Sequence, residues 1–332
     1  MRVPATSTST AAWPNRVMSM PPSCTSSQPA APLLRTPCMG LIHDAYALMS
    51  GVLAPVTVNY GRSLQFAGRD LPRPVGRRVL TRHGRVKVDV YLPPGVTSPP
   101  VYVHFHGGAF IMRYPKMDDF FCRFLVAEAG VAVVNVDYLV APRVRYPVAH
   151  EQAHDVLAWL GEHAGEWGLD ARRITVGGFS GGGNLAASAC LQARDLGTVT
   201  PLLQLLAVPS LDVAGDVHAK PSTIAHPMIG PELLTLVRAT YFKDAARRAE
   251  PYASPLLAES VAGLPPAVVF TAAHDSLRAE GDAYAARLAS EGLLVEHRVV
   301  PGRDHYFLDG DDPVQARGLL TDLAAHVRAA TS

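Results

Sequence analysis

The sequence has few of the features that mark membrane proteins, nucleic-acid-binding proteins or disulfide-stabilised proteins. No apolar run approaches the roughly 20 residues that a membrane-spanning helix needs, so we expect no membrane span. The formal net charge over 332 residues is only +1, which gives no electrostatic basis for binding nucleic acid. The four cysteines form no CxxC pair and no metal-like cluster. This scarcity predicts a reducing, cytoplasmic setting and a protein without metal or cofactor.

The N-terminal segment differs in composition from the rest of the chain. Its first 38 residues hold eleven Ser or Thr and seven Pro, with little hydrophobic periodicity and no continuous apolar stretch of the kind a secretory signal needs. We therefore expect residues 1–40 to be a disordered extension and residues 41–332 to form the folded domain. Met18, Met20 and Met39 are each a candidate start of a shorter chain.

The order of apolar patterns in the folded part predicts its class. Residues 77–92 alternate as a β-hairpin does, and strands and helices alternate after them. Strand-like runs are 101–106, 131–137, 174–178, 202–208, 267–272 and 295–300. Helix-like stretches are about 118–129, 149–166, 181–195 and 277–291, with a last one after residue 312. The fold class is therefore α/β, with a mainly parallel central sheet flanked by helices on both faces.

Two segments do not follow this alternation. Residues 41–60 have the apolar spacing of one or two helices, and residues 209–265 form a long insertion with helical character at 231–242. An insertion of this size usually lies over one edge of the sheet, where ligands bind beyond the carboxyl ends of the strands. We expect it to be a lid over the substrate pocket.

Ser180 is the strongest candidate for a catalytic residue. It lies in Gly178-Phe179-Ser180-Gly181-Gly182, between the strand-like run at 174–178 and the helix that follows. This position fits a nucleophile elbow, in which small neighbours let strand and helix pass closely enough to expose the hydroxyl. A glycine-rich phosphate loop or a plain turn would explain the five residues about as often, so further residues must decide.

An activated serine needs donors for the oxyanion, a base and an acid that orients the base. The turn His106-Gly107-Gly108-Ala109-Phe110 follows a strand, and paired glycines let backbone N–H groups converge there; Gly181 would supply a further N–H.

The preferred base is His305, because it follows the last strand in a turn-rich loop. Asp275 follows the strand 267–272 and opens a helix, so it is the preferred acid, although an N-cap would also explain it. Ser276 is available to cap that helix instead. His274 and His297 compete as bases, and Asp304 and Asp309 compete as acids.

These residues resemble one known family. Ser180-Gly-Gly-Gly-Asn-Leu-Ala, His106-Gly-Gly-Ala-Phe, Asp137-Tyr138 with Ala141-Pro142, Asp275-Ser-Leu-Arg-Ala-Glu-Gly and Tyr252-Ala-Ser-Pro-Leu are similar to motifs of the hormone-sensitive-lipase-like α/β-hydrolases, the bacterial family IV esterases. The resemblance covers residue 41 to the end. It implies an α/β-hydrolase fold with a helical cap built from about 41–70 and 209–265.

The resemblance also implies a mechanism and a substrate class. Ser180, His305 and Asp275 would hydrolyse carboxylic esters through an acyl-enzyme, with Gly107, Gly108, Ala109 and Gly181 forming the oxyanion hole and His106 supporting its loop. A pocket walled by Phe110, the N-terminal helix and the lid would favour small-molecule esters with acetyl to about hexanoyl chains. The resemblance also makes the last helix and the final strand candidate surfaces for a homodimer.

The sequence departs from the family at four positions. Ala109 replaces a glycine, Phe179 replaces Asp or Thr before the nucleophile, Gly181 replaces an alanine, and Arg143 replaces an acidic residue. None of these changes removes a catalytic group. Two other functions remain open: a non-hydrolytic ligand-binding homologue, and an amidase or formamidase that uses the same triad.

Overall fold

The computed structural model describes residues 37–58, 63–308 and 310–332. The predicted disordered extension lies outside the described residues except at its end. Helix α1 begins at Pro37, so residues 37–40, which we assigned to the extension, are helical. Proline is well tolerated in the first turn of a helix because its missing N–H would have no partner there. Of the two alternatives for residues 41–60, one helix or two, the described residues 41–58 contain one, α1.

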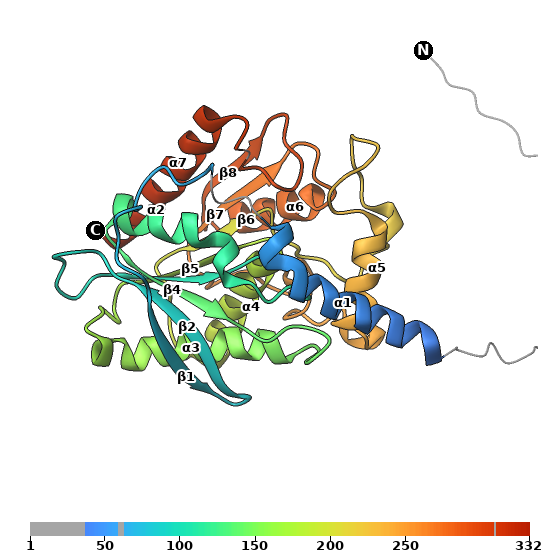
Figure 1. Cartoon of the computed structure of the whole chain (residues 1–332), viewed down its shortest axis with the longest axis horizontal. Helices are drawn as coiled ribbons and strands as arrows, with labels where there is room; N and C mark the ends of the chain where they lie inside the picture. The colour runs from blue at the N-terminus through green and yellow to red at the C-terminus, as the bar shows by residue number, and fades with distance from the viewer. Residues whose placement is uncertain (1–36, 59–62, 309) are drawn as a thin grey trace, which may run out of the picture. The chain divides into compact units, whose positions relative to one another are not determined.

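An eight-stranded sheet forms the centre of the described part of the chain (Figure 1). Its strands are β1 (Val75–Thr81), β2 (Gly84–Tyr91), β3 (Val101–Phe105), β4 (Ala132–Asp137), β5 (Ile174–Phe179), β6 (Gln204–Ala207), β7 (Ala267–Ala272) and β8 (Leu294–Val300). They lie in the order β1-β2-β4-β3-β5-β6-β7-β8. Strand β2 pairs antiparallel with both β1 and β4, and β3 to β8 are all parallel to one another. This confirms the predicted mainly parallel sheet.

Helices cover both faces of this sheet. The α-helices are α1 (Pro37–Thr57), α2 (Asp119–Ala129), α3 (Val148–His163), α4 (Gly181–Leu196), α5 (Pro231–Thr240), α6 (Arg278–Ser290) and α7 (Pro313–Thr331). Helix α3 packs on α4, and α2 packs on α7 (Figure 1). Val101, Val103 and Phe105 of β3 join the core beside α3 and α4, whereas Tyr102 joins the core beside α2 and α7. Successive side chains of a strand point to opposite faces, so one strand supplies both cores.

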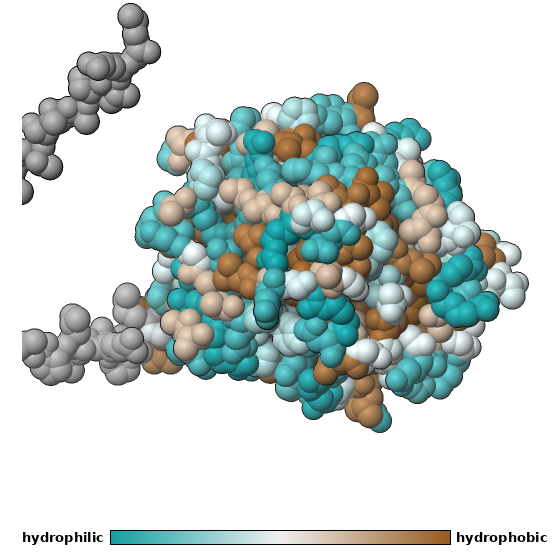
Figure 2. Space-filling model, turned by 180° about the vertical axis from the view of Figure 1, so that it is seen from behind, coloured by the Kyte–Doolittle hydropathy of each residue, from teal (hydrophilic) through white to brown (hydrophobic). Residues whose placement is uncertain are grey.

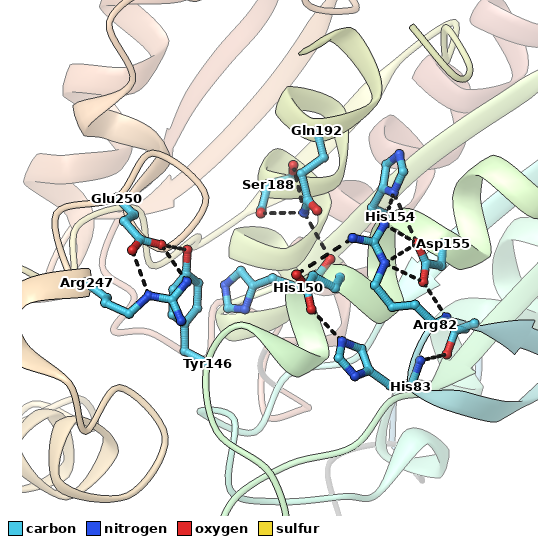
Figure 3. Close-up of polar contacts among 12 residues, drawn as sticks. Arg82, His83, Tyr146, His150, His154, Asp155, Ser188, Gln192, Arg247 and Glu250 are labelled. Atoms are coloured by element: carbon cyan, nitrogen blue, oxygen red, sulfur yellow. Dashed lines mark hydrogen bonds and ion pairs between the residues drawn. The ribbon is translucent and has the colours of Figure 1, made fainter. Parts of the chain in front are cut away.

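Polar side chains fasten the hairpin to α3 (Figure 3). Arg82 contacts Asp155 at 2.6 Å, and His83 contacts Glu151. On the other side of α3, the Gln192 amide of α4 donates to the His150 carbonyl at 3.0 Å. These contacts hold α3 between the hairpin and the helix that follows Ser180.

The predicted lid region packs against the N-terminal helix. Helix α5 lies beside α1 (Figure 1), and the two are in contact. No helix among the described residues is long and apolar enough to cross a membrane. On the face opposite to Figure 1, hydrophobic and hydrophilic residues are interspersed (Figure 2).

Candidate active site

Ser180 lies at the turn between β5 and α4, with φ 56° and ψ −118°. This positive φ is rare for a residue with a side chain and marks a strained backbone. The neighbouring glycines explain how the turn is possible. A Cβ on Gly182 would lie 1.9 Å from the Phe105 carbonyl oxygen, and one on Gly178 would lie 2.5 Å from that same oxygen. Helix α4 therefore begins directly against the end of β3, as a nucleophile elbow requires.

Asp275 and His305 are paired in the fold. Asp275 follows β7 and His305 follows β8, and Asp275 Oδ2 lies 2.8 Å from His305 Nδ1. Asp275 is 2% exposed and His305 is 7% exposed. A carboxylate only accepts hydrogen bonds, so this contact places the imidazole proton on Nδ1 and leaves Nε2 as an acceptor.

Asp275 also accepts a bond from the backbone at the start of α6. Its Oδ1 accepts from the Leu277 N–H at 3.0 Å. The suggestion that Ser276 would take over this bond is wrong, because the Ser276 hydroxyl donates instead to the Ile229 carbonyl at 2.6 Å. The two carboxylate oxygens therefore serve separate partners: Oδ2 contacts the His305 imidazole, and Oδ1 accepts from the N–H of the residue that precedes α6.

The competing residues have other partners. His297 contacts Asp282 at 2.9 Å, and His274 contacts Thr223. Asp304 Oδ2 accepts from the Met228 N–H at 2.7 Å. Asp309 lies outside the described residues.

Two cavities meet at Ser180. The larger, of about 780 Å³, is lined by Ser180 and His305, by Gly107, Gly108 and Ala109, by residues 306–308 and by Ile229 and Leu233 of the insertion. The smaller, of about 460 Å³, is lined by Ser180, Gly181 and Phe110 together with α5. The expectation that the N-terminal helix walls the pocket is wrong for the residues described, since neither lining includes a residue of α1. That helix lies one layer further out, where Ala54 belongs to a cluster with Met117 and Met112.

The loop after β3 has an unusual backbone. Gly108 has φ 112°, Ala109 has φ 53° and Phe110 has φ 60°. The Gly108 carbonyl accepts from the N–H groups of Ile111 and Met112 at 3.0 and 2.9 Å, which closes the turn. Ala109 therefore adopts the positive φ that a family glycine would adopt without strain, at a cost of about 1 kcal/mol.

His106 supports this loop from beneath. Its Nδ1 lies 2.6 Å from the Gly107 carbonyl oxygen, and its ring stacks on Tyr138 at 4.4 Å between centroids. The Tyr138 hydroxyl donates to the His106 carbonyl at 2.7 Å. Burial lowers the pKa of His106 to about 4, so the ring is neutral and Nδ1 carries the donated proton.

Asn184 and Glu280 hold the segments around the cavities in place. The sequence analysis did not assign this role to either residue. The Asn184 amide nitrogen donates to the carbonyls of Ser210 and Ala253 at 2.7 and 3.0 Å, and its oxygen lies 2.8 Å from His150 Nε2. Glu280 accepts from the Leu211 N–H at 2.8 Å and pairs with Lys220, which lines the smaller cavity. Both residues lie within the motifs that carried the family likeness, so their presence there was the available signal.

The residues that depart from the family occupy distinct environments. Phe179 is 7% exposed, lines the larger cavity and packs on Phe121 at 4.7 Å between centroids. Arg143 is exposed. Across the described ranges, no group of three or more His, Cys, Asp or Glu side chains could hold a metal ion.

Comparison with known proteins identifies the family. The model of the alpha/beta hydrolase fold matches residues 102–309, and the chain belongs to this family. It is 33% identical over 255 residues to the carboxylic ester hydrolase LipN of Mycobacterium tuberculosis, covering 74% of this chain and 68% of that protein. It is 32% identical over 238 residues to an ethyl acetate hydrolase of Pseudomonas putida, covering 69% and 73%. The crystal structure of a thermostable esterase from Pseudomonas putida superposes with a TM-score of 0.76 at 31% identity, covering 87% of this chain and 90% of that one.

Proposed function

We propose that this protein is a carboxylic ester hydrolase in which Ser180 is the nucleophile, His305 the general base and Asp275 the residue that orients the base. The observation that carries the proposal is the convergence of a strained Ser180 and the Asp275–His305 pair on one cavity beside a glycine loop. The relatives described above are named as ester hydrolases, which supports the same reaction class.

The mechanism follows from these positions. Ser180 Oγ attacks the ester carbonyl carbon while His305 Nε2 takes the hydroxyl proton, and Asp275 stabilises the imidazolium through Nδ1–H. His305 then returns the proton to the leaving alcohol oxygen as the C–O bond breaks. Water, deprotonated by His305, attacks the acyl-enzyme, and collapse of the second tetrahedral intermediate releases the acid and regenerates Ser180.

The oxyanion formed in both steps is stabilised by backbone donors. Gly108 and Ala109 line the larger cavity, Gly181 lines the smaller one, and Ser180 lines both. Gly181 is the first residue of α4, where an N–H has no partner inside the helix. We assign these three N–H groups to the oxyanion hole, with Gly107 in the same loop and His106 as its support. Each donor contributes roughly 2.7–4 kcal/mol in hydrolases of this type.

We further propose that α1 and residues 209–265 form the cap and that acyl chains are short to medium in length. Residues of α5 line both cavities, and α1 packs behind Met112 and Met117, which line the larger one. Phe110 lines the smaller cavity and stacks on Tyr241 at 5.0 Å between centroids, so we expect it to limit the length of the acyl chain. We place the protein in the cytoplasm, because Cys122 and Cys190 are buried free thiols that suit a reducing compartment.

Hydrolysis of p-nitrophenyl esters from acetate to laurate, by wild type and Ser180→Ala, tests the proposal. Ser290→Ala is the matched control, because Ser290 is the exposed last residue of α6 and lines neither cavity. We expect short-chain turnover in wild type and control, at least 10³-fold less in Ser180→Ala, and a fluorophosphonate label on Ser180.

Other outcomes would change the assignment. A labelled Ser180 without ester turnover would favour an amide substrate. Absence of both turnover and label would favour the ligand-binding homologue. Full activity in Ser180→Ala would reject the mechanism.

A further inference from the structure

The larger cavity contains one carboxylate that the proposed mechanism does not use. Asp118 lines this cavity together with Ser180 and His305, and it is only 4% exposed. Most of the other side chains around it are apolar, and Met112, Met117 and Phe179 are among them. A carboxylate in such surroundings is costly unless each oxygen has a hydrogen-bond donor.

Only one of the two carboxylate oxygens has such a donor within the described part of the chain. Asp118 Oδ2 lies 2.9 Å from Nε2 of His104, a side chain with no exposed surface. Asp118 precedes the first residue of α2, yet its side chain makes no capping bond to that helix. His104 therefore holds the carboxylate in place through Oδ2, and Oδ1 remains available to a molecule in the cavity.

The position of His305 indicates which part of an ester reaches Asp118. His305 must protonate the leaving alcohol oxygen, so the alcohol part lies on the His305 side of Ser180. Residues 306–308, which follow His305, line the same cavity as Asp118. The smaller cavity, with Gly181 and Phe110, shares Ser180 with the larger one but includes neither His305 nor residues 306–308, so we assign it to the acyl part.

We propose that Asp118 is a specificity-determining residue that accepts a hydrogen bond from a hydroxyl group in the alcohol part of the substrate. The substrate class is then esters of diols and polyols, in which one hydroxyl is acylated and a neighbouring one is free. An ionised carboxylate can only accept hydrogen bonds, so an alkyl alcohol of equal size leaves Oδ1 without a donor. This inference rests on the proposed function and names the substrate class of the same site.

A pair of esters with equal numbers of heavy atoms tests the proposal. Propyl butyrate and 2-hydroxyethyl butyrate differ only in a terminal methyl or hydroxyl group. We expect wild type to hydrolyse the hydroxyethyl ester with at least ten-fold higher kcat/KM, the ratio that one hydrogen bond to a charged group supplies. Because both esters are measured with the same enzyme sample, the fraction of folded protein cancels from this ratio.

Three variants locate the preference. Asp118→Leu should bring the ratio to one or below, and Asp118→Asn, which keeps an acceptor oxygen but no charge, should give an intermediate ratio. Asp119→Asn is the matched control, because its carboxylate contacts Tyr91 and Arg123 at 2.8 Å and does not line the cavity. It should keep the wild-type ratio.

The outcomes separate this inference from the proposed function. A wild-type ratio near one, with normal p-nitrophenyl butyrate turnover, would overturn the role of Asp118 and leave the esterase assignment intact. A preference that persists in Asp118→Leu would overturn it equally. No turnover of any ester would overturn both.

Discussion

The approach of α4 to β3 makes Gly182→Ala the sharpest test of the elbow. Gly182 is the second residue of α4, and a Cβ there would lie 1.9 Å from the Phe105 carbonyl oxygen and 2.5 Å from that of His106. Both oxygens are backbone atoms at the end of β3, so no side-chain rotation relieves the overlap. Ordinary contact begins at 3.4 Å, so helix and strand must separate by about 1.5 Å.

That separation falls between the two halves of the proposed oxyanion hole. Gly181 moves with the helix, whereas Gly108 and Ala109 follow β3, so one oxyanion cannot reach donors on both sides. Loss of a donor, or a 1 Å misplacement, costs about 10²-fold in rate. We expect kcat/KM for p-nitrophenyl butyrate to fall at least 100-fold, and the free energy of unfolding to fall by about 1–3 kcal/mol.

Steady-state kinetics and thermal unfolding measure both effects. Gly318→Ala is the matched control, since Gly318 lies inside α7 with nothing within 4 Å of a Cβ. It should keep wild-type kcat/KM and gain up to about 1 kcal/mol from helix propensity. A Gly182→Ala enzyme within three-fold of wild type in kcat/KM would refute the close approach of helix and strand.

Two further predictions concern Asp275 and the buried histidines. Asp275→Asn should keep its oxygen on the Leu277 N–H and turn its NH₂ toward His305, which moves the imidazole proton to Nε2; kcat should fall roughly 10⁴-fold with no change in the unfolding temperature. Burial lowers the pKa of His106 to about 4 and of His150 to about 3, so the unfolded chain binds more protons than the folded one below pH 6.5. Each histidine should therefore remove about 1.4 kcal/mol of stability per pH unit as pH falls from 6.5 toward 4, and His150→Gln should lower that slope by this amount in denaturant titrations. Burial raises the pKa of Glu280 to about 7, so Glu280 adds stability as pH falls from 7 to 4.5, equally in wild type and in His150→Gln. Its effect therefore cancels from the comparison, and an unchanged slope in His150→Gln would contradict the lowered pKa of His150.

The sequence predicted the sheet well because its strands are short apolar runs bounded by turn residues. All eight strands lie where the patterns placed them, and β7 matches its predicted bounds. The α1 boundary was missed because the composition of the N-terminal segment does not change sharply at Pro37. Asp275 and His305 are in contact, whereas the role of Asp275 in orienting the catalytic base stays a prediction.

Sequence patterns could not predict contacts between distant segments. In the sequence, Asp118 is only the first residue of a predicted helix at about 118–129, and it is the fold that brings its carboxylate to His104 and to the cavity of Ser180. Asn184 likewise joins α4 to residues 26 and 69 positions further along the chain. Such contacts depend on how helices and loops cross, which hydrophobic periodicity does not encode.

The carbonyl contacts of the 106–109 loop also determine where its N–H groups point. In a planar trans peptide, the C=O and the following N–H lie in opposite directions. His106 Nδ1 holds the Gly107 carbonyl, so the Gly108 N–H points away from His106. The Gly108 carbonyl is held by Ile111 and Met112, so the Ala109 N–H points away from that turn. The direction of each N–H is therefore set by a bond on the far side of its own peptide unit, before any substrate arrives. If these groups form the proposed oxyanion hole, no part of the loop need reorient as negative charge develops.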